Sequence, residues 1–209
     1  MRVGEIAPGL WRWTGHHPEW KREVGCAYVE TRDGVCLIDP LVPPEDEERF
    51  LAALDRDVER AGGEVNVLLT IYWHGRSARR LVARYGARLW AHAPARAPVE
   101  RRVGPPSALF RPGDPLPGRI GAFPVRGSEV AFWLPAHRAL VFGDAVLGAE
   151  DGGLRLCPES WHPRGGGHAR VRENLRPLLD LPVERVLVSH GEPVLHGGRR
   201  ALEQLLGGA

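Results

Sequence analysis

Apolar and polar positions alternate along this chain in short runs that predict strands and helices in turn. Residues 24–31 and 35–39 read as two strands, and the Asp33-Gly34 step between them is a strong hairpin signal. A helix is expected from about Pro44, because proline and acidic side chains in a first turn suit a helix start and its dipole. Gly62-Gly63 then ends its apolar face.

A buried strand follows and leads directly into a polar loop. Residues 67–70 are continued by Ile71-Tyr72-Trp73-His74-Gly75-Arg76, and Ser77 is an N-cap residue type placed just before a new helical face. Loops between a strand and a helix hold much of the chemistry of α/β folds. This loop is therefore the first candidate for function.

The rest of the chain continues the alternation of strands and helices. It predicts a strand at 88–91, an irregular Pro- and Gly-rich surface excursion at 93–118, strands at 130–134 and 139–142, a Gly-rich stretch at 148–167, a helix at 168–179 with Pro177 as a candidate break, a buried strand at 185–189 and a helix at 199–206. Nothing in the composition divides the chain. We expect one α/β domain over residues 1–209.

Charge and cysteine content argue against several classes of partner. The 28 basic and 26 acidic residues leave a formal net charge of +2, so no strong field points to nucleic acid or a membrane surface. The three cysteines have no C-x-x-C spacing and are too few for a disulfide framework, which indicates a reducing interior. No apolar run has the length of a signal-peptide core or a membrane span. We expect a cytoplasmic protein with neither nucleic-acid nor membrane partners, and the sequence carries no signal for its oligomeric state.

Four loops at strand ends carry side chains with candidate chemistry. They are residues 71–76, Pro124-Val125-Arg126-Gly127-Ser128, Phe142-Gly143-Asp144-Ala145 and Ser189-His190-Gly191-Glu192-Pro193. Taken singly, each has an ordinary structural explanation. An Asp after a Gly is usually a turn or a cap, and a His before a Gly is more often a hydrogen-bonded structural residue than a ligand.

Three further segments are weaker candidates. The aromatic stretch at 11–20 either covers the mouth of a cleft or packs on the fold, and Trp161 could line one wall of a binding site. Arg164-Gly165-Gly166-Gly167 resembles an anion-binding helix start, but it lacks phosphate-loop spacing, so a flexible loop is favoured.

The order of the four loops resembles the metallo-β-lactamase fold superfamily over residues 24–193. Residues 35–40 look like the family's early strand with its apolar-Asp step, and residues 68–70 resemble the strand before its H-x-H-x-D-H metal loop. Phe142-Gly143-Asp144 resembles its Gly-Asp step, and residues 188–193 resemble its closing Gly-His-Gly-type loop. The resemblance implies an αββα sandwich, with two mixed sheets flanked by helices and the active edge built from these loops.

Most positions that hold metal in the family carry other residues in this chain. Ile71 and Trp73 stand at the two His positions of H-x-H-x-D-H, Gly75 at the Asp and Arg76 at the last His. Arg126 stands where the family usually places a further His. Against the family's pattern only Asp144 and His190 match, and His74 is displaced by one residue from a ligand position.

These departures argue against a family-type metal centre. A catalytic zinc site takes at least three protein ligands, so no metal cofactor is expected. If one binds, it is a single zinc, iron or manganese ion held by His74, Asp144 and His190. Since a guanidinium repels a cation and pairs with carboxylates, we expect Arg76 or Arg126 to act as the counter-ion of Asp144.

Three functions remain open from these residues. The first is a metal-free relative that binds a small, anionic ligand through Arg76 and Arg126. The second is a mononuclear metal-dependent hydrolase of an ester, amide or thioester, with a metal-bound water as nucleophile. The third is a non-catalytic interaction protein. We favour the first, with a ligand site formed by His74, Arg76, Arg126, Asp144, Trp161 and His190.

Overall fold

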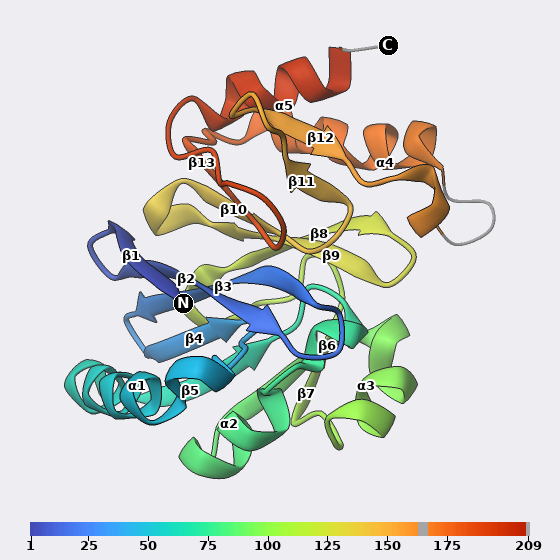
Figure 1. Ribbon diagram of the computed structural model, residues 1–209. Helices are drawn as coiled ribbons and strands as arrows, with labels where there is room; N and C mark the ends of the chain where they lie inside the picture. Colours follow the sequence, from blue (N-terminus) through green and yellow to red (C-terminus); the bar gives the residue numbers. More distant parts are fainter. Residues whose placement is uncertain (163–166, 208–209) are drawn as a thin grey trace.

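Two β-sheets pack face to face, with helices on their outer sides (Figure 1). This computed structural model describes residues 1–162 and 167–207. The first sheet contains, in chain order, β1 (Arg2–Ala7), β2 (Leu10–His17), β3 (Arg22–Thr31), β4 (Gly34–Ile38), β5 (Glu64–Leu68), β6 (Arg88–His92) and β7 (Ala108–Phe110). The second has the order β13 (Arg185–Val188), β10 (Ala139–Phe142), β9 (Glu129–Leu134) and β8 (Gly121–Arg126). A separate pair is formed by β11 (Val146–Gly148) and β12 (Leu154–Leu156).

The helices cover the outer face of each sheet. On the first sheet these are α1 (Glu47–Ala61), α2 (Ala78–Tyr85) and α3 (Arg96–Arg102). On the second they are α4 (His168–Leu175) and α5 (Gly198–Gly207) (Figure 1). This is the αββα sandwich that the sequence predicts. Within the described residues, no helix is both long and apolar enough to cross a membrane.

Strand β4 shows why its sequence reads as an unbroken apolar run. Val35 and Leu37 belong to the core under α1 and α2, whereas Cys36 and Ile38 belong to the core between the two sheets. Side chains of a strand alternate between its two faces, so a strand covered on both sides has no solvent-facing position. Burial on both faces fixes the strand in the middle of the sandwich.

The direction of the strands brings their carboxyl ends to one edge of the sandwich. Strands β4 to β7 run parallel, as do β10 and β13 in the second sheet. The backbone N–H of Gly25 in β3 donates to the Ser189 carbonyl after β13 at 2.7 Å, so the two sheets touch at this edge. The loops that follow β4, β5, β10 and β13 therefore lie close together.

The predicted irregular excursion at 93–118 is wrong in part. It contains α3 and also β7, which pairs in parallel with β6. Pro98 is the third residue of α3, and a proline is tolerated in a first turn because the N–H it lacks has no partner inside the helix. Proline content therefore misleads at this point.

Other predicted elements hold with small changes. The hairpin of β3 and β4, the helix ended by Gly62 and strands β9, β10 and β13 are confirmed. Ser77 precedes α2 but makes no cap bond, because its hydroxyl accepts the Val42 N–H at 2.9 Å instead. Past Leu175 the chain continues as a 3-10 turn, Arg176–Asp180, which contains Pro177.

Candidate functional site

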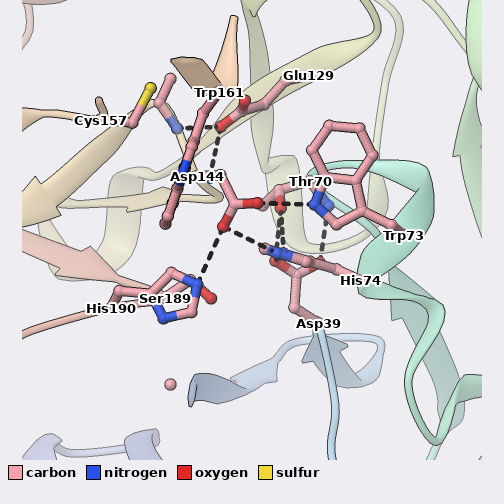
Figure 2. Close-up of polar contacts among 12 residues, drawn as sticks. Asp39, Thr70, Trp73, His74, Glu129, Asp144, Cys157, Trp161, Ser189 and His190 are labelled. Carbon is pink, nitrogen blue, oxygen red and sulfur yellow. Dashed lines mark hydrogen bonds and ion pairs between the residues drawn. The ribbon is translucent and has the colours of Figure 1, made fainter. Parts of the chain in front are cut away.

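Four strand ends contribute polar side chains to one network (Figure 2). Asp39 follows β4, Thr70 follows β5, Asp144 follows β10 and His190 follows β13. Gly143 makes the close approach possible, because a Cβ at this position would lie only 2.6 Å from Thr70 Oγ1. The sequence predicts this gathering of strand-end loops, and the contacts below confirm it.

His74 lies at the centre of the network and is fully buried. It sits in a short 3-10 turn, Tyr72–Gly75, between β5 and α2. Its Nδ1 is 2.7 Å from Asp39 Oδ2, and its Nε2 is 3.1 Å from Asp144 Oδ1. Asp39 also accepts hydrogen bonds from the backbone N–H (2.8 Å) and the hydroxyl of Thr70. The imidazole thus bridges two carboxylates (Figure 2).

The two carboxylates decide the protonation of His74. Burial lowers the pKa of His74 and so does Arg76, but Asp144 and Asp39 outweigh both, and the pKa is raised above its ordinary value. A doubly protonated imidazole can donate one hydrogen bond to each carboxylate. The geometry therefore fits an imidazolium held between Asp39 and Asp144.

Asp144 receives donors from three side chains. Trp73 Nε1 donates to its Oδ2 at 2.7 Å, and His190 Nε2 lies 3.3 Å from its Oδ1, the atom that His74 also contacts. Burial alone would raise the pKa of Asp144, but His74 and His190 hold it well below its usual range. The carboxylate is thus kept ionised by the side chains of this chain.

The loop of Asp144 is fixed by a buried ion pair. Arg126 Nε donates to Glu129 Oε2 at 2.6 Å, and both side chains are almost fully buried. Glu129 Oε1 accepts the backbone N–H groups of Asp144 (2.7 Å) and Ala145 (2.8 Å). Burial raises the pKa of Glu129, and Arg126 opposes that rise. Arg126 thus positions the Asp144 loop through Glu129, and in the described residues it forms no hydrogen bond with Asp144.

Arg76 joins the two sheets by hydrogen bonds. Its Nη1 donates to the carbonyls of Gly25 (3.0 Å) and Asp39 (2.8 Å), and its Nη2 donates to Ser189 Oγ at 2.6 Å. The prediction that Arg76 or Arg126 pairs with Asp144 is therefore wrong. The cation beside Asp144 is His74, because the 3-10 turn carries its ring between the two carboxylates while both guanidiniums bind elsewhere.

A cleft of about 560 Å³ opens in front of Asp144. It is lined by Glu19, Trp20, Arg22, Trp73, Arg102, Arg126, Asp144, Trp161 and His190. Arg22 lies over the Trp161 ring at 5.6 Å, and Arg102 over the Tyr72 ring at 5.7 Å. Across residues 1–162 and 167–207, neither arginine forms an ion pair with a carboxylate.

Most of the predicted site residues line this cleft. Arg126, Asp144, Trp161 and His190 do so directly, and His74 lies behind Asp144. Arg76 lines an adjoining hollow together with Trp20 and Trp73. Their role in ligand binding stays a prediction. The N-terminal aromatic segment at 11–20 does both things that were expected of it, because Trp20 lines the cleft and Trp13 is buried in the fold. Of the predicted Gly-rich loop, residues 164–166 lie outside the described residues.

Sequence reasoning missed several members of the network. Asp39 stands out only as the end of an apolar strand, although it holds both Thr70 and His74. Glu129 lies one residue beyond the loop that contains Arg126, and its i, i+3 spacing from Arg126 is the signal that could have found it. Trp73 was noted as a replaced ligand and is in fact a donor to Asp144.

The residues at the positions of the family's ligands do not fit a metal ion. Both nitrogens of His74 face carboxylates, and Asp144 is occupied by three donors. Gly75 stands where the family's motif has Asp, and a Cβ on it would lie 2.5 Å from Val103 Cγ2. Val103 caps α3, so the packing of this helix leaves no room for a carboxylate. We therefore derive no chemistry from a metal ion at the cleft floor.

Comparison with solved structures identifies the fold. A metallo-beta-lactamase from Pontibacter korlensis is 17% identical over 100% of this chain and 99% of its own, with a TM-score of 0.73. The mono-zinc form of FIM-1 from Pseudomonas aeruginosa is 12% identical over 99% and 93%, with a TM-score of 0.72. DIM-1 exposed to ceftazidime is 15% identical over 99% and 96%, with a TM-score of 0.70. No protein-family profile and no curated protein matches the sequence. The chain has the metallo-β-lactamase fold, as its sequence predicts.

Proposed function

We propose that this chain, whose fold is that of the metallo-β-lactamases, binds a small anionic ligand in the cleft without a metal ion. One observation carries the proposal. Asp144 already has His74 and His190 as partners within the chain, whereas Arg22 and Arg102 line the same cleft without a carboxylate partner in the described residues. Glu19 also lines the cleft, but the two arginines outnumber it, so the charge that remains available to a ligand is positive on balance.

The positive groups of the cleft suit an acidic ligand. Guanidinium groups form short, paired hydrogen bonds with carboxylate and phosphate oxygens. Arg126 also lines the cleft, and although Glu129 pairs with it, its Nη2 is buried without a hydrogen-bond partner in the described chain. An anionic oxygen near Arg126 would satisfy that group, since an unpaired buried donor is costly.

The walls of the cleft suit a flat apolar body. Trp20, Trp73 and Trp161 all line it, from loops after β2, β5 and β12 respectively. A volume of about 560 Å³ is that of an ordinary small-molecule site. Aromatic rings prefer to stack or meet edge to face. We infer an aromatic carboxylate or aryl phosphate as the class of ligand.

The alternative, a mononuclear hydrolase, has less support. It requires His74 to offer a free ring nitrogen to the metal, and each nitrogen lies within 3.1 Å of a carboxylate oxygen. An interaction protein with a filled cleft is also less favoured, because the cleft remains open between the tryptophans.

Pairs of related small molecules that differ in charge test the proposal. Benzoate is compared with benzamide and phenyl phosphate with phenol, by calorimetry and by the change in tryptophan fluorescence. We expect the anion of each pair to bind and its neutral analogue to bind at least about tenfold more weakly, the effect of one charge-assisted contact. Chelator should leave the affinity unchanged.

Variants of the cleft arginines locate the binding. Arg22→Ala/Arg102→Ala should abolish the preference for the anion, whereas Arg32→Ala/Arg111→Ala, at two exposed arginines away from the cleft, should keep it. Equal binding of anion and neutral analogue by the parent protein, or an unchanged preference in Arg22→Ala/Arg102→Ala, would reject the proposal.

A further inference from the structure

We propose that Glu159, His162 and His168 bind one divalent transition-metal ion, with zinc the best match, beside the cleft and not at its floor. One candidate ligand atom from each residue lies within 4.8 Å of the other two. Glu159 belongs to a 3-10 turn, Glu159–Trp161, His162 directly follows it, and His168 is the first residue of α4. None of the three occupies a position of the H-x-H-x-D-H loop.

His168 is oriented as a metal ligand would be. Its Nε2 lies 2.7 Å from the backbone carbonyl of Cys157, which accepts the ring N–H. Its Nδ1 then faces Glu159 Oε1 at 3.1 Å. A ring nitrogen whose partner nitrogen donates to a carbonyl presents its lone pair, and this arrangement is usual for histidine ligands. A cation would bind the lone pair and the carboxylate together.

His162 supplies the second nitrogen. Its Nε2 is 3.6 Å from Cys157 Sγ, a weak partner. Its Nδ1 is buried and has no hydrogen-bond partner among the residues that the structure describes. The His162 and His168 rings meet edge to face with centroids 5.1 Å apart, so they lie side by side. A buried ring nitrogen without a partner calls for one, and a metal ion shared with His168 provides it.

The ligand set selects the kind of ion. Two imidazole nitrogens and one carboxylate oxygen suit zinc and its neighbours, whereas calcium and magnesium prefer all-oxygen sites. In tetrahedral zinc sites with bonds of about 2.0–2.1 Å, ligand atoms are about 3.4 Å apart. The Glu159–His168 pair at 3.1 Å already has that spacing, so the metal requires only His162 to approach. A water would complete the coordination.

Metal retention by the purified protein tests the site. After incubation with zinc and desalting, we expect about one equivalent of bound zinc, and Co²⁺ in its place should give the strong visible absorption of a four-coordinate ion. Glu159→Gln, which preserves the shape of an exposed side chain, should weaken zinc affinity at least about tenfold, and His168→Ala should abolish retention. Circular dichroism confirms that each variant is folded.

Two controls separate this site from other places. His196→Ala/Glu184→Gln removes a second His–carboxylate pair, with its two atoms 3.6 Å apart and no third ligand among the described residues, and it should retain zinc like the parent. His190→Ala should also retain zinc. Loss of zinc in His190→Ala with retention in Glu159→Gln and His168→Ala would place the ion at the cleft floor and overturn the inference. So would a parent protein that retains no zinc. A parent protein without zinc leaves the anion-binding proposal untouched, because anion binding is measured with chelator present. Zinc at the cleft floor would instead contradict the metal-free cleft of that proposal.

Discussion

His74 Nε2 lies 3.1 Å from Asp144 Oδ1, and the opposite nitrogen of the same ring lies 2.7 Å from Asp39. A histidine whose pKa is raised by two carboxylates therefore lies against the carboxylate that resembles the metal-bridging Asp of the family. The group that holds Asp144 ionised is a side chain of the protein itself, so a chelator cannot remove it.

Stability should decline at high pH because of His74. The pKa of His74 is raised in the folded state. Its contribution to the free energy of unfolding is therefore complete below the unfolded-state pKa of about 6.5, and it is lost as pH rises through the folded-state pKa. Asp144 has a lowered pKa, so its contribution is present above about 3.9 and is lost as pH falls through the folded value. Between these limits the pair stabilises most.

Denaturant unfolding at several pH values measures this effect. His74→Gln should flatten the decline above about pH 6.5, and His74→Ala should cost about 3–5 kcal/mol at neutral pH, since it leaves two buried carboxylates without their cation. His137→Gln is a control histidine outside the network. The same pH profile in His74→Gln and the parent would show that His74 does not carry the effect.

The Arg126–Glu129 pair should behave as a buried ion pair. Glu129→Ala removes the partner of Arg126 and the acceptor of two backbone N–H groups, so we expect a loss of about 3–5 kcal/mol. Arg126→Met/Glu129→Gln, which removes both charges and keeps a carbonyl acceptor, should recover part of this loss. Thermal and urea unfolding measure both variants. If the double variant is no more stable than Glu129→Ala, the loss of stability does not come from the broken charge pair.

Restoring four of the family's ligand positions, with Arg76 kept at the fifth, should not restore a metal centre. In Ile71→His/Trp73→His/Gly75→Asp/Arg126→His, the new Asp meets Val103 and the loss of Arg126 leaves Glu129 unpaired. We expect no zinc beyond the amount retained by the parent. Adding Val103→Gly makes room at position 75 and should improve metal retention, with circular dichroism to check that the variant is folded. Full retention without the change at Val103 would show that α3 does not block the site.

Arg76 should resist conservative replacement. Its two terminal nitrogens reach Gly25, Asp39 and Ser189, and a lysine ammonium cannot span these acceptors in the same fork. Arg76→Lys should therefore cost about 1–3 kcal/mol, the range for donors lost to buried acceptors. Arg80→Lys, on the exposed face of α2, is the matched control. Urea unfolding distinguishes the two variants, which should differ in midpoint and not in slope.

The sequence was sufficient for the fold and for the gathering of loops, because the order of its strand-end loops resembles that of the metallo-β-lactamase superfamily. It was insufficient for the pairing of charges. Which of Arg76, Arg126 and His74 faces Asp144 depends on the 3-10 turn at Tyr72–Gly75, a local geometry that no periodicity encodes. The turn is packed against α3, and the prolines of 93–118 concealed that helix. The missed helix α3 thus accounts both for the wrong prediction of an irregular excursion at 93–118 and for the glycine at position 75, where the family's motif has Asp.

The chain order of the two sheets has a consequence for synthesis. Strands β1 to β7 end at Phe110, so the entire first sheet leaves the ribosome before β8 begins at Gly121. At that stage His74 has Asp39 but not Asp144, and the Ser189 acceptor of Arg76 does not yet exist. His74 and Arg76 lack these partners until β13, the last strand of the described chain, has been made and is followed by Ser189 and His190. The charge network is therefore complete only when both sheets have assembled. In a chain that ends before β13, His74 and Arg76 remain without these partners.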